Sequence, residues 1–127
     1  MSDGEETPDG FSFAGIAAGL KDSKKKDLAL ILAPENSICS GLFTQSIVRA
    51  SCVDICEQRI KKSSGHIRAI LINSGQANAC TGDFGIQHTL IATNKVSQLL
   101  GINEEEVLMC STGVIGIPIQ IKNLIDN

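Results

Sequence analysis

A hydroxyl and a glycine stand together near the end of the sequence, within the segment Cys110-Ser111-Thr112-Gly113-Val114-Ile115-Gly116. The apolar run Val107-Leu108-Met109 precedes this segment and predicts a buried strand that ends here. Glycine at 113 lets the chain turn where a side chain would clash, which leaves its N–H pointing outward beside the Thr112 hydroxyl. Two such donors can stabilise the negative oxygen that develops when an acyl carbonyl is attacked. The pattern therefore indicates an oxyanion hole, although in isolation a Ser-Thr-Gly after a strand is more often an ordinary turn.

A second polar segment, residues 73–82, is small, rich in amides and unsuited to any regular element. Asn and Gly favour tight turns and positive φ, so one interpretation is a packed connection whose amides satisfy buried backbone groups. In the functional interpretation, Asn73 and Asn78 lie near a polar site. Their amide side chains would there orient a substrate or brace the neighbouring turn.

Apolar runs separated by turn residues predict the elements that must position these segments. Residues 13–20 and 28–33 predict a hairpin around a charged turn, residues 40–44 a third strand, and residues 67–72 a fourth. A helix is expected over about residues 53–61. Strands that alternate with helices in this way indicate α/β layering.

A second helix is expected where apolar residues from Ile86 to Leu100 recur at helical intervals. Thr81 or Asp83 can cap its first turn, and Gly101 can end it. Asn103 can then cap a further turn, formed by three consecutive glutamates, before the strand that begins at Val107.

Composition limits the classes of function. A chain of 127 residues is long enough for one core, which must be aliphatic because only four Phe and no Trp or Tyr are present. The net charge is −3 and the basic residues are scattered apart from residues 24–26, so nucleic acid is not expected as a partner. No apolar run is long enough to span a membrane.

Cysteine usage and the N-terminus indicate the compartment. The five cysteines are odd in number and irregular in spacing, which does not suggest a disulfide framework and fits a cytoplasmic location. Residues 1–9 are acidic and polar, and we expect a disordered tail there rather than a targeting signal. Residues 10–127 are then expected to form the ordered portion.

Taken together, several ordered segments resemble the ornithine acetyltransferase family, whose members carry both glutamate N-acetyltransferase and ornithine acetyltransferase activity in arginine biosynthesis. The resemblance runs through nearly the whole chain from residue 10. The segments that carry it are Gly10-Phe11, Ala14 to Lys21, Asp27 to Ile31, Gly41 to Thr44, Val48-Arg49-Ala50, Arg68 to Gly75, Ala77 to Gly82, and Val107 to Gly116 with Pro118.

The resemblance implies a layered α/β sandwich of the ornithine acetyltransferase (DmpA-like) type, of which this chain is the incomplete N-terminal, α-chain portion. It implies a self-cleaving enzyme that moves an acetyl group from N-acetylornithine to glutamate through an acetyl-threonine, without a cofactor or a metal. Thr112 and Gly113 are then the oxyanion hole. The implied partners are a complementary β chain that carries the threonine nucleophile, in an α2β2-type assembly, and the two small-molecule substrates.

The chain departs from the family pattern in two places. None of its threonines lies in the Lys-Gly-Ala-x-Thr-Met type segment that holds the family's nucleophile, so we expect no nucleophile in this chain. The family's Ala-Pro is replaced by Ser51-Cys52. The chain alone is therefore expected to be inactive, and an inactive fragment or an interaction subunit is the alternative function.

Two further alternatives use the cysteines. Cys80 or Cys110 could act as a nucleophile with His88 or His66 as the base, which would make the protein a cysteine-dependent hydrolase. Structural burial of these thiols is the simpler interpretation. Residues 52 and 56 could also share a helical face toward a metal, but no second pair of ligands follows them, and we expect no metal site.

Overall fold

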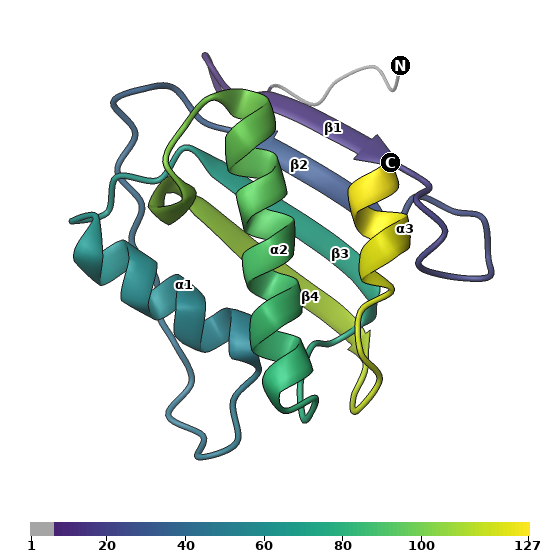
Figure 1. Ribbon diagram of the computed structural model, residues 1–127. Coiled ribbons are helices and arrows are strands. Elements are labelled where there is room, and N and C mark those ends of the chain that lie inside the picture. The colour runs from purple at the N-terminus through teal and green to yellow at the C-terminus, as the bar shows by residue number, and fades with distance from the viewer. Residues whose placement is uncertain (1–6) are drawn as a thin grey trace.

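The computed structural model describes residues 7–127, so the predicted polar tail lies largely outside the described residues. Within residues 7–127, four strands, three α-helices and one 3-10 helix follow one another (Figure 1). The strands are β1 (Ser12–Ile16), β2 (Leu28–Leu32), β3 (Ala69–Gln76) and β4 (Val107–Val114). The helices are α1 (Ser51–Lys62), α2 (Asp83–Leu100), η1 (Glu104–Glu106) and α3 (Ile121–Asp126).

The strands form a single sheet in the order β1-β2-β3-β4. β1 and β2 pair antiparallel, as the predicted hairpin requires, and β3 continues the antiparallel arrangement beside β2. β3 and β4 are parallel because α2 carries the chain back to the starting edge between them. The carboxyl ends of β3 and β4 consequently lie side by side.

All three α-helices lie on the same side of the sheet, with α2 running along its middle (Figure 1). The buried core lies between the sheet and these helices and is aliphatic, as the composition predicts. Its largest members come from β2, β3, β4 and α2 and from the segments that flank them: Leu20, Leu28, Leu71, Val96, Val107, Met109, Ile119 and Leu124. The chain is thus a two-layer α/β structure, in agreement with the predicted class.

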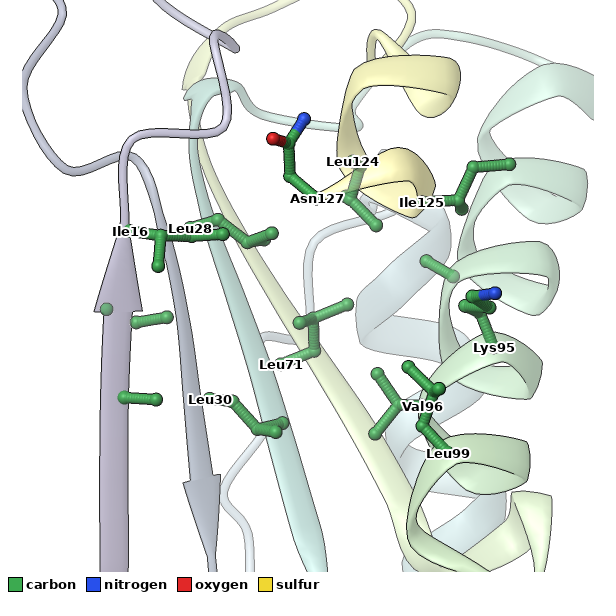
Figure 2. Close-up of a pocket in the computed structure, with 14 residues that line it drawn as sticks. Ile16, Leu28, Leu30, Leu71, Lys95, Val96, Leu99, Leu124, Ile125 and Asn127 are labelled. Atoms are coloured by element: carbon green, nitrogen blue, oxygen red, sulfur yellow. The ribbon is translucent and has the colours of Figure 1, made fainter.

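An apolar groove of about 250 Å³ remains open where α2 and α3 do not reach the hairpin (Figure 2). Figure 2 shows Leu28 and Leu30 of β2 on one side, with Val96 and Leu99 of α2 opposite. None of the residues that line it belongs to the Cys110–Gly116 segment. This groove is therefore separate from the predicted oxyanion site.

Helix α1 covers the first half of the outer edge of β4. The buried Cys56 thiol donates a hydrogen bond to the Met109 carbonyl (3.3 Å) and accepts one from the Met109 N–H (3.4 Å). Burial raises the pKa of this thiol to about 11, so it serves as a neutral hydrogen-bonding group. The Arg59 guanidinium donates to the Val107 carbonyl at 2.7 Å. Residues 112–114, which follow the part of β4 that α1 covers, are exposed.

Several expected local features differ from the structure. Residues 40–44 form no strand: the only bridge near this segment is the isolated one between Ile38 and His66, and Phe43 packs against the cluster of Cys56, Ile67 and Leu108 without strand pairing. β3 extends through Gln76, so the first part of the amide-rich segment is strand rather than loop. Helix α3 had no counterpart in the sequence interpretation.

The predicted helix ends are correct in part. Gly82 is the N-cap residue of α2, and no side chain caps it, so the prediction of a cap at Thr81 or Asp83 is wrong. Thr81 instead donates its hydroxyl to a neighbouring amide oxygen. Gly101 ends α2 in the left-handed conformation, and Asn103 forms a capping box at η1, as predicted.

Asp27 fixes the segment between β1 and β2. Its carboxylate accepts backbone N–H bonds from Ala18 (2.7 Å), Leu20 (2.7 Å) and Lys21 (2.9 Å), and its own carbonyl accepts the Ser74 N–H at 2.8 Å. Burial by itself would raise the pKa of Asp27. The three N–H donors and the nearby Lys21 charge outweigh burial and hold the pKa below its usual range. Asp27 thus holds residues 18–21 with its carboxylate and contacts β3 with its backbone carbonyl.

We predict that Asp27→Asn lowers the free energy of unfolding by about 1.5–3 kcal/mol, because an amide nitrogen replaces an oxygen that accepts N–H bonds. A carboxyl group with a lowered pKa stabilises the fold above its unfolded-state pKa, and that stability disappears as the pH falls through the folded-state value. The parent should therefore lose stability below about pH 4, and the variant should lose less. Denaturant unfolding across this pH range measures both effects, with exposed Asp22→Asn as the control. An equal pH dependence in parent and variant would contradict the assignment.

Candidate active site

The predicted site lies where β3 and β4 end side by side. The parallel register places Asn73 opposite Ser111, Ser74 opposite Thr112, and Gly75 opposite Gly113. The two polar segments that the sequence singled out therefore come together, although they are far apart in the chain. Such an edge, at the carboxyl ends of parallel strands, is where open α/β sheets bind ligands.

Gly75 and Gly113 form a close contact between the two backbones. Both have φ of +131°, a conformation that L side chains rarely adopt. A Cβ added at Gly113 would collide with the Gly75 backbone and would lie 2.7 Å from the Gln76 nitrogen. A Cβ at Gly75 would lie 2.8 Å from the Leu20 carbonyl oxygen. Only glycine fits at either position.

The expected turn at Gly113 is wrong, because β4 runs through Gly113 to Val114 and the chain turns at residues 115–116. Gly113 serves the close approach to Gly75, which depends on a strand 38 positions away and has no signature in the local sequence. The turn itself is held by a bond from the Gly116 N–H to the Ala79 carbonyl at 2.8 Å.

Alternation along β4 predicts the direction of the Gly113 N–H. Backbone groups alternate in direction along an extended strand. Met109 directs its N–H and carbonyl to Cys56 at the outer edge, whereas the Val114 carbonyl accepts the Ala77 N–H (2.9 Å) on the side of β3. Gly113 alternates in step with Met109. We therefore expect its N–H at the outer edge of β4, beyond the part that α1 covers.

Thr112 is exposed beside Gly113, on the face of the sheet opposite the helices. Its neighbour across the register, Ser74, accepts a hydrogen bond from the Lys21 ammonium at 3.1 Å. Sequence reasoning missed this lysine as a site residue, because 53 positions separate it from Ser74 and no local pattern links them. The Thr112 hydroxyl and the Lys21 ammonium thus both lie at this end of the sheet, on either side of Ser74.

Asn73 lies beneath this end of the sheet with no exposed surface. Its amide donates to the Gln76 carbonyl at 3.1 Å and so spans the Gly75 position. Its Oδ1, like the buried Ser111 hydroxyl opposite, has no partner among the described residues. This placement makes Asn73 a bracing group rather than a group that touches a substrate, and its effect on catalysis stays a prediction.

Asn78 is also fully buried, and it adopts a positive φ of 53°. Its amide donates to the Gly85 carbonyl (3.2 Å) and to the Thr89 hydroxyl (2.7 Å), while its Oδ1 accepts the Thr81 hydroxyl (3.3 Å). These bonds tie the loop after β3 to the first turns of α2. The interpretation of residues 77–82 as a packed connection therefore describes the geometry, and Asn78 braces it.

The cysteine alternatives find little support in the geometry. Burial of its thiol raises the pKa of Cys110, although other parts of the residue are exposed, and a raised pKa disfavours the reactive thiolate. Cys80 is exposed on the loop and the Nδ1 of His88 is buried without a partner in the described part of the chain. Cys52 and Cys56 are buried, and residues 7–127 contain no cluster of three or more groups that could hold a metal. All five cysteines are free thiols.

Residues 12–127 match the ArgJ family. The chain belongs to the ArgJ family. It is 94% identical, over its whole length, to a protein of Prochlorococcus marinus subsp. pastoris named arginine biosynthesis bifunctional protein ArgJ, of which it covers 32%. It is 47% identical over 120 residues to the protein of the same name from Caldanaerobacter subterraneus subsp. tengcongensis, of which it covers 29%. The chain thus spans about a third of the length of these curated relatives.

Solved structures agree with this membership. Ornithine acetyltransferase from Mycobacterium tuberculosis, crystallised in complex with ornithine, matches with a TM-score of 0.89 and 37% identity over 94% of this chain and 64% of that chain. An ArgJ protein from Bacillus halodurans matches with a TM-score of 0.87 and 31% identity over 93% of this chain and 61% of that chain. The predicted fold type is therefore confirmed. Among the described residues, no helix is long and apolar enough to cross a membrane.

We predict that Gly113→Ala destabilises the protein by about 2–4 kcal/mol, because a methyl group would add both backbone strain and a collision with Gly75. Gly116→Ala is the matched control. Gly116 has a φ of +80° but open space around its Cβ position, so only the strain of about 1–2 kcal/mol applies. Denaturant unfolding compares the two variants. Equal losses would show that the contact with Gly75 carries no weight.

Proposed function

We propose that this chain is the N-terminal part of an acetyltransferase that moves an acetyl group from N-acetylornithine to glutamate through an acetyl-threonine, and that it supplies the oxyanion hole. The single observation that carries the proposal is the exposure of Thr112 and Gly113 side by side at the uncovered end of β4. Membership of the ArgJ family supports the reaction class.

The chemistry of acyl transfer explains why this pair matters. When a nucleophile attacks the acetyl carbonyl, negative charge develops on the carbonyl oxygen. Donors that are already in place stabilise that charge without reorganising, and one such donor typically contributes a factor of about 10²–10³ in turnover. The close contact between Gly75 and Gly113 fixes the backbone donor, and the neighbouring strand fixes the position of Thr112.

The nucleophile belongs, in this proposal, to a complementary β chain. Thr89 and Thr93 are buried in α2 and donate their hydroxyls to helix carbonyls at 2.8 Å and 2.9 Å, which leaves them unsuited to attack. The chain also covers 64% of the solved Mycobacterium chain but only 32% of the curated Prochlorococcus relative. This difference supports division of the full protein into an α and a β chain, as autocatalytic cleavage before the nucleophile would produce.

We also propose the assembly, the compartment and the catalytic base of the enzyme. The two chains would assemble as α2β2 in the cytoplasm, where free thiols such as the five of this chain persist. The new α-amine of the β-chain threonine would act as the base for its own hydroxyl. No step requires a cofactor or a metal.

The alternative, an interaction subunit without activity of its own, has one observation in its favour. The hairpin and the segments beside the site expose large apolar side chains, including Phe13, Val114 and Ile115, each more than half exposed. Exposed apolar surface of this kind marks an interface. The same surface is needed to receive a β chain, so the two interpretations differ only in whether acetyl transfer follows assembly.

We predict that Thr112→Val lowers turnover by about 10²–10³ in a chimaera in which this sequence replaces the matching third of the Prochlorococcus relative. Valine keeps the branched shape of threonine but removes the hydroxyl, and Thr112→Ser, which keeps it, should recover most of the activity. Because the donor acts in the transition state, kcat and kcat/KM should fall together. Steady-state acetyl transfer from N-acetylornithine to glutamate is the measurement, and the chain alone should form no acetyl adduct by intact mass. Normal turnover for Thr112→Val in an assembled chimaera would contradict the oxyanion assignment.

A further inference from the structure

The groove between the hairpin and helices α2 and α3 is open and almost entirely apolar (Figure 2). Lys95 and Asn127 are the only polar side chains that line it among the described residues. The Asn127 amide is already engaged, because it donates to the Asn123 carbonyl at 2.9 Å. Sites for polar small molecules combine apolar walls with several convergent polar groups. This groove lacks such groups, so an apolar occupant fits it better.

Helix α2, which forms one wall of the groove, is apolar on more than one face. The residues that it buries are mostly small or carry a hydroxyl: Gly85, Thr89, Ala92, Thr93, Val96 and Ser97. Its larger apolar side chains are between 40% and 73% exposed: Phe84, Ile86, Leu90, Ile91 and Leu99. A helix that is apolar all round is typical of a buried helix. The most exposed of these side chains, Leu99, lines the groove, so we expect a further element to cover α2 there.

Helix α3 leads to the groove. Leu124 is buried in the core, and Ile121 and Ile125 pack against it, so the inner face of α3 follows the helical spacing i, i+3, i+4. Leu124 and Ile125 also line the groove, as does Asn127, which directly follows α3. Figure 2 shows Asn127 beside the opening. A segment that continues from α3 therefore begins at the groove.

The longer relatives contain chain that could fill this space. The chain covers 32% of the Prochlorococcus relative and 64% of the solved Mycobacterium chain, so more than a third of each lies outside the match. The groove has a volume of about 250 Å³. An apolar cavity of about 150 Å³ holds one benzene ring, so the groove has room for roughly two large apolar side chains. One turn of an amphipathic helix presents two such side chains to a groove.

We infer that the groove is the docking site of the segment that directly follows the matched third in the full-length protein, and that this segment fills it with two large apolar side chains one helical turn apart. The segment would join the hairpin to α2 and complete the aliphatic core. A separate molecule needs to bury about 1,200 Å² or more for a stable interface. A tethered segment needs far less, because its effective concentration is high.

The test measures solvent access to the groove in the same chimaera, which contains the segment. Leu99→Cys and Ile16→Cys place thiols on opposite walls at positions that are exposed here, and Lys25→Cys in the exposed turn is the control. Alkylation is followed peptide by peptide with mass spectrometry, which separates each new thiol from the five native cysteines. Each rate is divided by that of the denatured variant. Both groove thiols should react about 100-fold more slowly than the control, because reaction requires local opening.

The identity of the occupant is tested with a diazirine-bearing amino acid at position 99 of the chimaera. Its photochemical cross-link should map to the segment immediately after the matched third, with a yield that does not depend on protein concentration. Alkylation as fast as that of the control would overturn the inference, because the groove would be open. Protection without a cross-linked peptide would indicate a small apolar molecule, and a cross-link to a second copy or to a remote segment would indicate another occupant. Each of these results would also overturn it. None of them depends on acetyl transfer, so an inactive chimaera would contradict only the proposed function.

Discussion

The contact between Gly75 and Gly113 is the constraint on which the candidate site depends. The two parallel backbones approach so closely that a Cβ at Gly113 would collide with Gly75, and the Leu20 carbonyl leaves no room for a Cβ at Gly75; both residues adopt φ of +131°. β4 continues beside β3 through Gly113 to Val114, and alternation along the strand predicts a Gly113 N–H at the outer edge. The absence of a side chain at Gly75 leaves room for the Leu20 carbonyl and the Lys21 stem. A side chain at Gly113 would push against the Gly75 backbone, and one at Gly75 would push against Leu20 and Lys21, which links the packing of the sheet to the groups at its edge.

Helix α1 divides the edge of β4 into two parts with different roles. Over the first part, the Cys56 thiol and the Arg59 guanidinium satisfy the strand's outward groups, so this stretch is closed to other partners. Over the second part, residues 112–114 are exposed. The open groove in Figure 2 and the exposed apolar side chains of the hairpin form a second apolar surface that no element of this chain covers among the described residues. These uncovered regions agree with a chain that spans about a third of its relatives, and with a nucleophile delivered from elsewhere.

The strands and long helices could be predicted from the sequence wherever the residues that become buried form a continuous apolar run or recur at helical spacing. The continuous apolar runs of β2 and β3 and the helical spacing of α2 are of this kind, as are the glycine that ends α2 and the asparagine that caps η1. The errors arose where distant contacts decide the local structure. Residues 40–44 have strand-like composition but no neighbouring strand to pair with, and Gly113 follows its partner in β3 instead of turning. Thr112 and Gly113 were predicted from the residue pattern after a strand and from the family resemblance, and their role stays a prediction, whereas the bond from Lys21 to Ser74 joins residues 53 positions apart and needed the folded structure.

The central claim is that the Thr112 hydroxyl and the Gly113 N–H donate to the oxygen of the reacting acetyl group. The most direct measurement is the infrared carbonyl stretching frequency of an isotope-labelled acetyl group in the acetyl-enzyme of the chimaera, formed from N-acetylornithine in the absence of glutamate. Hydrogen bonds from both donors polarise the carbonyl. The frequency should therefore lie below that of the same acetyl ester in water, and Thr112→Val should raise it while Thr112→Ser does not. A frequency equal to that of the free ester, and unchanged by Thr112→Val, would contradict the account.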